Sequence, residues 1–328
     1  MKVHVLGTGR SVPAHCLQSA EIDCPAHMKD RIDVVGVRQR YVCRSETQID
    51  LAEAACAKAL TDAGLKAEEI DVVISAASVP YQLIPSTAPL VMRALGISDG
   101  TAAAFDVNST CLSFVSALEV AARMIEGGAV RHVLVVSSEI ASRGLPWTTA
   151  PDVAALFGDG AAAAVLGAAP ETSASEIKAV RLRSYPAAYD ACGICAGGTR
   201  FDFETDYQGF KAHSKFSMEG KALFRLTSQY FSGFVEDLLT QAGWDQSDVD
   251  LVVPHQASPA GLEHMIRHTG FDRNRVMRIV EDYGNQVAAS IPFTFDVARE
   301  RGLAPAGTRV LMLGTSAGVS FGGAALVI

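Results

Sequence analysis

The segment AGLKAEEIDVVI at residues 63–74 returns 179 residues later as AGWDQSDVDLVV at residues 242–253. Each copy runs from an Ala-Gly helix end through a polar turn into a buried strand. Two further pairs of similar segments follow in the same order along the chain: residues 133–136 match 310–313, and residues 157–158 match 321–322. We call these pairs echoes. This order predicts two related α/β units packed about a pseudo-twofold axis. The plainer alternative is that similar buried strands merely share Val and Ile.

Apolar runs of strand length alternate with stretches of helical period from end to end, which is typical of sheets covered by helices. Strands are expected at 2–6, 70–75, 102–107, 131–137, 161–166, 177–183, 248–253, 275–280, 308–313 and 322–328. Helices are expected at about 47–64, 87–95, 111–127, 219–242, 259–269 and 287–301. We divide the chain into an N-terminal half, 1–172, and a C-terminal half, 173–328.

The composition of the chain argues against several classes of protein. The chain has 328 residues, 49% of them hydrophobic, 20% charged and 28 of them glycine, so it is long enough for two packed units of about 150 residues. A net charge of −8 argues against a nucleic-acid partner. Seven scattered cysteines indicate reduced thiols rather than a disulfide framework. Without a signal-like start or an apolar run of about 18 residues, we expect a cytoplasmic protein with no membrane partner.

Cys111 is the candidate nucleophile. It follows the strand-like run at 102–107 and opens a helical segment, where free backbone N–H groups and the helix dipole favour a thiolate. An isolated cysteine is more often a small buried hydrophobic residue.

Two polar residues follow strands in the second half. His255 comes directly after the strand at 248–253, and Asn285 follows the one expected at 275–280. Ligands gather at the carboxyl ends of strands in α/β sheets, and the repeat places both residues opposite Cys111. Taken alone, His255 is more often a structural histidine and Asn285 more often part of a turn. Together with Cys111, they predict one site.

The three residue types make coherent chemistry. A Cys111 thiolate can take an acyl group from a thioester, and N–H donors on His255 and Asn285 can stabilise the enolate of a second thioester. The glycine-rich tail at 314–323 brings bare backbone N–H groups to the same place, and one can complete an oxyanion hole with the Cys111 amide. The tail lacks the phosphate-loop patterns, which argues against nucleotide hydrolysis.

Cys192 and Cys195 form a single Cys-x-x-Cys pair. One such pair without a second is weak evidence for zinc, and no thioredoxin-like context supports a redox role. No metal and no cofactor are therefore expected.

The chain resembles the condensing enzymes of the thiolase superfamily, specifically β-ketoacyl-acyl-carrier-protein synthase III. The likeness runs nearly the full length and rests on motifs in order and spacing: GVRQR at 36–40, IPSTA at 84–88, Cys111, FGDG at 157–160, AGGTR at 196–200, MEGK at 218–221, PHQA at 254–257, GN at 284–285 and the glycine-rich tail.

The resemblance implies a duplicated five-layer αβαβα fold with two mixed sheets, a homodimer, and Cys111, His255 and Asn285 as catalytic residues. It further implies decarboxylative Claisen condensation of the acyl group on Cys111 with a malonyl thioester, in fatty-acid or secondary-metabolite synthesis. The oxyanion hole would use the backbone of Cys111 and Ala317, and the acyl pocket Ile84, Phe157 and Met218. Ile84 would reach into the partner's pocket.

The sequence departs from the family at the entrance for coenzyme A. Relatives that use acyl-CoA clamp the nucleotide with a Trp and two Arg, and here those positions hold Asp30, Val34 and Pro151. Either CoA binds differently or the acyl group arrives on an acidic carrier protein. Basic residues available to a carrier are Lys221, Arg225, Arg267, Arg273 and Arg275. The plainer interpretation of these charges is a solvated helix face.

Three alternatives remain open. The same residues could transfer an acyl group to an oxygen or nitrogen nucleophile, with His255 as general base, or condense two acyl thioesters without loss of CO₂. The chain could also be a catalytically silent subunit that binds a carrier, because a fold alone does not fix a function.

Overall fold

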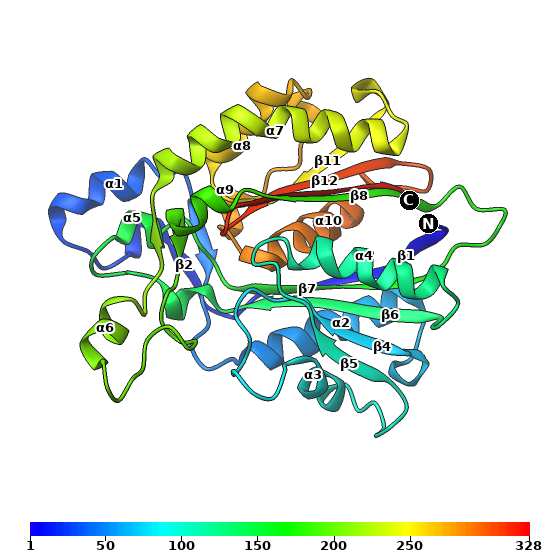
Figure 1. Ribbon diagram of the computed structural model, residues 1–328, viewed down its shortest axis with the longest axis horizontal. Coiled ribbons are helices and arrows are strands. Elements are labelled where there is room, and N and C mark those ends of the chain that lie inside the picture. The colour runs from blue at the N-terminus through cyan, green and yellow to red at the C-terminus, as the bar shows by residue number, and fades with distance from the viewer.

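The computed structural model describes all 328 residues and contains two sheets that lie between layers of helices (Figure 1). The first sheet has the strand order β1-β7-β6-β4-β5 and the second β11-β12-β13-β8. The first uses β1 (Val3–Ser11), β4 (Val72–Ser75), β5 (Ala103–Asp106), β6 (His132–Glu139) and β7 (Gly160–Ala168). The second uses β8 (Glu176–Ser184), β11 (Leu251–Pro254), β12 (Arg309–Ser316) and β13 (Ser320–Val327).

The two sheets repeat one topology. In the first, β4 pairs parallel with β6, β6 antiparallel with β7, and β7 antiparallel with β1. In the second, β11 pairs parallel with β12, β12 antiparallel with β13, and β13 antiparallel with β8. The register agrees as well, because Val72 lies opposite Val133 and Leu251 opposite Val310. The duplication predicted from the echoes is confirmed.

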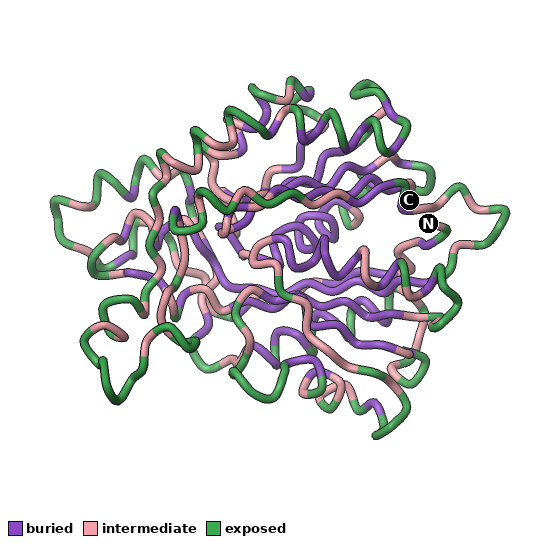
Figure 2. Tube along the Cα trace, in the orientation of Figure 1, coloured by how far each residue is buried: buried purple, intermediate pink, exposed green.

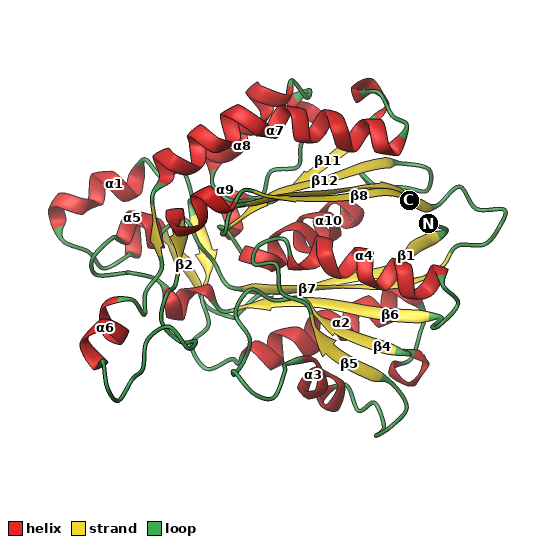
Figure 3. Ribbon diagram, in the orientation of Figure 1, coloured by secondary structure: helices red, strands yellow, loops and turns green.

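Helices fill three layers around these sheets (Figure 3). The middle layer holds α4 (Ser113–Glu126) and α10 (Ser290–Glu300), which lie between the sheets. The outer layers hold α2 (Gln48–Ala63) with α3 (Ala88–Ala94), and α7 (Gly220–Ala242) with α8 (Pro259–Thr269). The predicted five-layer αβαβα arrangement with two mixed sheets is confirmed.

The repeated Ala-Gly dipeptides end the outer helices α2 and α7. Gly64 closes α2 with φ of 67° and Gly243 closes α7 with φ of 71°. This left-handed conformation suits glycine because it has no Cβ to clash with the following carbonyl. Each chain reversal then leads into a buried strand, β4 in the first sheet and β11 in the second.

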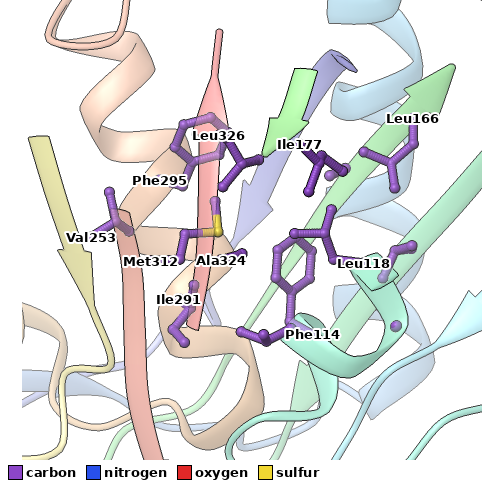
Figure 4. Close-up of a cluster of buried hydrophobic side chains, with 14 of the residues drawn as sticks. Phe114, Leu118, Leu166, Ile177, Val253, Ile291, Phe295, Met312, Ala324 and Leu326 are labelled. Carbon is purple, nitrogen blue, oxygen red and sulfur yellow. The ribbon is translucent and has the colours of Figure 1, made fainter. Parts of the chain in front are cut away.

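A single apolar core joins the two halves (Figure 4). Phe114 and Leu118 of α4 meet Ile291 and Phe295 of α10, and all four are buried. Burial is concentrated in the middle layers, while the outer faces of α7 and α8 are exposed (Figure 2). Because the middle helices bury their side chains against both sheets, each half stabilises the other.

The strand predicted at 275–280 is wrong. This segment makes one isolated bridge, between Val252 and Val276, and ends in the short helix α9 (Val280–Tyr283). The buried carboxamide of Gln256 occupies the hydrogen bonds that a strand would use: its Nε2 donates to the carbonyl of Met277 and its Oε1 accepts from the backbone N–H of Ile279. The Gln256 side chain therefore makes the hydrogen bonds that a strand equivalent to β5 of the first sheet would make.

Short elements that the sequence analysis did not predict gather beyond one end of the sheets (Figure 3). They are β2 (Cys16–Gln18), α1 (Lys29–Asp33), β3 (Gln39–Tyr41), α5 (Pro151–Ala154), β9 (Cys192–Gly193), α6 (Tyr207–Ala212) and β10 (Ser217–Met218). Each is too short to show a clear hydrophobic period. None of the helices combines the length and hydropathy needed to cross a membrane.

Candidate active site

Cys111 lies in the turn between β5 and α4, half-buried. Thr110, just before it, has φ of 54°, in the left-handed region. Two side chains fix this turn: Asn108 Oδ1 accepts from the Thr110 N–H at 2.9 Å, and Ser113 Oγ donates to the Thr110 carbonyl at 2.7 Å. The polar residues around Cys111 therefore hold the thiol in an otherwise unfavourable backbone turn.

The electrostatic environment makes the thiol the resting form. Burial raises the pKa of Cys111 to about 12, and the negative charge of Glu139 acts in the same direction. The backbone N–H groups of Ala317 and of Cys111 itself lower this pKa but do not offset burial. The expectation that the helix start would leave a thiolate is therefore wrong at rest, although the N–H donors on which it rested are present.

Ala317 brings a backbone N–H to Cys111. It lies in the turn between β12 and β13, next to Gly318, and its N–H donates to Sγ of Cys111. The Cys111 N–H also acts on the same sulfur. Two backbone N–H donors at one nucleophile are the arrangement that an oxyanion hole requires.

The glycine-rich tail makes this approach sterically possible. Leu112 is fully buried, and a Cβ added to Gly314 would lie 3.0 Å from one of its methyl carbons. A Cβ on Gly322 would lie 2.9 Å from the other. Bare backbone at these two positions leaves room for Leu112, and so for the start of α4 against β12 and β13.

His255 follows β11 directly, and its backbone N–H donates to the carbonyl of Leu313 on β12 at 2.7 Å. Its side chain is buried and its Nδ1 has no partner in the protein. Burial lowers the pKa of His255 to about 4, so the imidazole is neutral near pH 7. A neutral ring carries one N–H, which it can donate to a substrate oxygen.

Asn285 is held by backbone pairing with the FGDG segment. Its N–H donates to the carbonyl of Leu156 at 2.8 Å, and its carbonyl accepts from the N–H of Gly158 at 3.1 Å. Its Oδ1 accepts from the N–H of Val287 at 2.8 Å, and its Nδ2 donates to the carbonyl of Ala257 at 3.4 Å, which leaves one amide N–H as the free donor. A Cβ on Gly284 would lie 2.8 Å from the backbone of Phe157, so only glycine fits there.

Cys111, His255 and Asn285 line one cavity of about 690 Å³. Phe157 and Met218 line it too, and Phe157 packs edge-on against Phe216 with ring centroids 5.2 Å apart. Such a volume with a mostly apolar wall suits an acyl chain and its thioester arm. Ile84 does not line this cavity, and it is 87% exposed.

The five basic residues expected to meet a carrier divide into two groups. Lys221, Arg225 and Arg267 are exposed and make no ion pair. They lie on α7 and α8, which also carry Phe224 and His264 of the cavity wall. Arg273 instead pairs with Glu263 at 2.5 Å, and Arg275 donates to the backbone carbonyls of Ser247 and Val249.

Cys192 lies in the wall of the same cavity, whereas Cys195 does not. The negative charge of a Cys192 thiolate would raise the pKa of Cys111, so the two thiols lie near each other. No group of three or more His, Cys, Asp or Glu side chains is placed to hold a metal ion.

Sequence reasoning missed two buried polar residues of this region, Glu139 and Gln256. Glu139 ends β6 and lines the cavity with Cys111. Its signal was available, because it lies two residues after the strand expected at 131–137, at the carboxyl end of that strand. Gln256 had no comparable signal, since its partners Met277 and Ile279 were expected in a strand.

Comparisons with known proteins agree with this geometry. The family model "3-Oxoacyl-[acyl-carrier-protein (ACP)] synthase III" matches residues 105–186, and the model of its C-terminal part matches residues 239–328. The thiolase N-terminal domain matches residues 35–144. A β-ketoacyl-[acyl-carrier-protein] synthase III of Thiobacillus denitrificans is 34% identical over 98% of each chain. The chain belongs to the β-ketoacyl-acyl-carrier-protein synthase III family.

Other members of the family are similar over at least 95% of their length. β-Ketoacyl-[acyl-carrier-protein] synthase III 3 of Streptomyces coelicolor is 36% identical over 98% of this chain and 95% of the relative. The crystal structure of 3-oxoacyl-[acyl-carrier-protein] synthase III from Aquifex aeolicus superposes with a TM-score of 0.88 at 27% identity, covering 99% of this chain and 100% of that one. This synthase is therefore a condensing acyltransferase with the thiolase fold.

Proposed function

We propose that Cys111, His255 and Asn285 carry out a decarboxylative Claisen condensation of an acyl thioester with a malonyl thioester. The observation that carries this assignment is their meeting in one cavity, with the Ala317 N–H directed at Sγ of Cys111. The reaction divides into acylation of Cys111 and condensation.

In the first step Cys111 Sγ attacks the thioester carbon of the donor. The new S–C bond forms as the donor's C–S bond breaks, and the thiol proton leaves with the departing thiol. The oxyanion of the tetrahedral intermediate accepts from the Cys111 and Ala317 N–H groups. Because the resting thiol is neutral, an acyl donor enters without meeting a buried charge on sulfur.

In the second step the malonyl thioester binds with its thioester oxygen facing His255 and Asn285. The neutral imidazole and the free carboxamide N–H each donate to this oxygen, which becomes an enolate as the C–C bond to the carboxylate breaks and CO₂ leaves. The carbanion attacks the acyl carbon on Cys111. The C–S bond to Cys111 then breaks, and the β-ketoacyl thioester leaves.

We further propose that the acyl donor is carried by an acyl carrier protein. The positions that clamp CoA in relatives hold no stacking or cationic side chain: Val34 is exposed, and Pro151 is buried as the first residue of α5. Lys221, Arg225 and Arg267 are unpaired cations on α7 and α8, the helices that carry part of the cavity wall, and they offer an acidic carrier complementary charge.

A homodimer completes this proposal. Strand β5 is an edge strand, bonded only to β4, and the loop before α3 is anchored on it because Thr87 N–H donates to Asp106 at 2.7 Å. Leu83 and Ile84 in this loop are 73% and 87% exposed. An unpaired edge beside bare apolar side chains favours pairing with a second copy, which places Ile84 in the partner's acyl pocket.

We place the synthase in the cytoplasm, where thiols stay reduced. All seven cysteines are unpaired, and the two cavity thiols require reducing conditions to stay so.

Intact-protein mass spectrometry tests the assignment. Incubation with a panel of acyl-CoA and acyl-carrier substrates should add one acyl mass to the wild type and none to Cys111→Ala. Malonyl thioester should then release CO₂ and restore the free enzyme. An adduct that persists in Cys111→Ala would overturn the nucleophile, and condensation without CO₂ would overturn the decarboxylation.

A further inference from the structure

Glu139 is a buried carboxyl group outside the three proposed catalytic residues. It ends β6, its side chain is 1% exposed, and it lines the cavity with Cys111. No Lys, Arg or His forms an ion pair with it. Because a buried carboxyl without a counter-charge is costly, other groups must hold it in place.

Three backbone N–H groups hold this carboxyl. Ser78 N–H donates to Oε1 at 2.5 Å, and the N–H groups of Val79 and Ala288 donate as well. Ser78 and Val79 belong to the loop after β4, whereas Ala288 lies in the short turn Val287–Ala289 that follows Asn285. One side chain thus joins two loops that both line the cavity.

The turn held by Glu139 is the one that orients Asn285. Val287 has φ of 52°, a left-handed conformation that a β-branched residue rarely adopts. Its N–H donates to Asn285 Oδ1, so this turn fixes which way the carboxamide faces. Such a conformation persists only where surrounding contacts hold it, and the next peptide is the one bound to Glu139.

We infer that Glu139 is a positioning residue for the condensation step: by accepting the N–H groups of Ser78, Val79 and Ala288, it fixes the turn that aims the Asn285 amide at the malonyl thioester. This inference rests on the proposed role of Asn285. It assigns no contact with substrate to Glu139.

The inference separates the two steps of the reaction. Acylation of Cys111 uses the N–H groups of Cys111 and Ala317, neither of which depends on the 287–289 turn. Decarboxylation uses Asn285, which does. Burial raises the pKa of Glu139 to about 8, so this carboxyl is mostly neutral near pH 7 and its removal should leave the Cys111 thiol little changed. Loss of Glu139 should therefore impair the second step alone.

The variant Glu139→Gln tests this expectation. A carboxamide keeps the size but turns an NH₂ group toward one of the three N–H donors, so at least one hydrogen bond is lost. CO₂ release from malonyl thioester should fall by about 10- to 100-fold, the range seen for supporting groups at other sites. Acyl transfer to Cys111 and its alkylation by iodoacetamide should be as fast as in the wild type.

Two further variants keep the test decisive. Glu119→Gln changes a partly exposed glutamate of α4 and should leave both steps unchanged. Glu139→Asp keeps the carboxyl group but shortens the reach. It replaces Glu139→Gln if circular dichroism shows that the latter is unfolded, and it should show the same selective loss. Equal loss of both steps, or wild-type CO₂ release from a folded Glu139 variant, would overturn the inference. A wild type that neither forms an adduct nor releases CO₂ would instead overturn the proposed function.

Discussion

The backbone N–H of Ala317 donates a hydrogen bond to Sγ of Cys111, across the boundary between the two halves of the molecule. Ala317 lies in a turn between two strands of the second sheet, and Cys111 lies in the turn that starts a helix of the middle layer. The proposed oxyanion hole therefore draws one N–H from each half.

Removal of this N–H should slow acylation. Ala317→Pro deletes the donor, and loss of one oxyanion-hole donor costs about 10²- to 10³-fold in rate. The single-turnover rate of acyl-Cys111 formation measures the effect. Ala317→Gly is the matched control, because it keeps the N–H and should react within a few-fold of the wild type. Equal rates in a folded proline variant would contradict the oxyanion hole.

The alkylation rate of Cys111 should keep rising with pH. Because the pKa of Cys111 is raised to about 12, the thiolate fraction should increase about tenfold per pH unit from pH 7 to 10, whereas an unperturbed thiol levels off near pH 9. Peptide mapping after iodoacetamide treatment separates this thiol from the other six. The raised pKa also means that the folded state holds this proton more tightly, so the free energy of unfolding should fall above pH 9, less so in Cys111→Ala. A plateau below pH 9 would contradict the burial argument.

A methyl group on Gly314 should strain the packing of Leu112. Gly314→Ala places a Cβ 3.0 Å from Leu112 and 3.2 Å from the Cβ of His255, and overpacking of this kind lowers the free energy of unfolding by about 1–3 kcal/mol. Urea unfolding measures it. Gly233→Ala is the control, since it lies within α7 with open space at its Cβ and should stabilise the helix by up to about 1 kcal/mol. If both variants are equally stable, β12 can shift to accommodate the added methyl group beside Leu112 without a loss of unfolding free energy.

Shortening Ile84 should change chain-length selectivity. If its side chain fills the end of the partner's acyl pocket, Ile84→Gly deepens that pocket, and longer acyl donors should gain in competition assays read by adduct mass. Leu303→Gly removes another exposed apolar side chain, on the loop after α10, and should leave selectivity unchanged. Unchanged selectivity in Ile84→Gly would argue against this placement, and a monomer by sedimentation at assay concentrations would argue against the dimer.

Charge reversal beside the cavity should weaken the binding of carrier-bound substrates and leave the binding of CoA-bound substrates unchanged. The double variant Lys221→Glu, Arg225→Glu should raise the KM for acyl carrier protein about tenfold at low salt and less at high salt, because screening shortens the range of such charges. The KM for the same acyl group on CoA should not change. Arg301→Glu alters another exposed cation and serves as the control. An equal effect on the KM of both donors would show that the carrier protein does not bind to these helices.

Much of the fold could be predicted from the sequence because it is encoded by local and repeated signals. The echo of 63–74 at 242–253 reports the same helix end, turn and buried strand in each half, so it predicted the duplicated topology. The 275–280 segment shows the limit of such signals. Its apolar residues fit a strand, but the buried Gln256 side chain takes over their hydrogen bonds, and a side chain from another segment leaves no periodic trace.

The sequence by itself determined the residue types of the site: a thiol before a helix, an imidazole and a carboxamide after strands, and a glycine-rich tail. Only the tertiary structure decided their states and supports. The thiol is neutral at rest because burial outweighs its N–H donors, and the imidazole is neutral for the same reason. Ile84 faces away from its own cavity, and Glu139 joins two loops that are far apart in the chain. Solvent exclusion and through-space hydrogen bonds depend on the packing of both halves, which no local stretch of sequence contains.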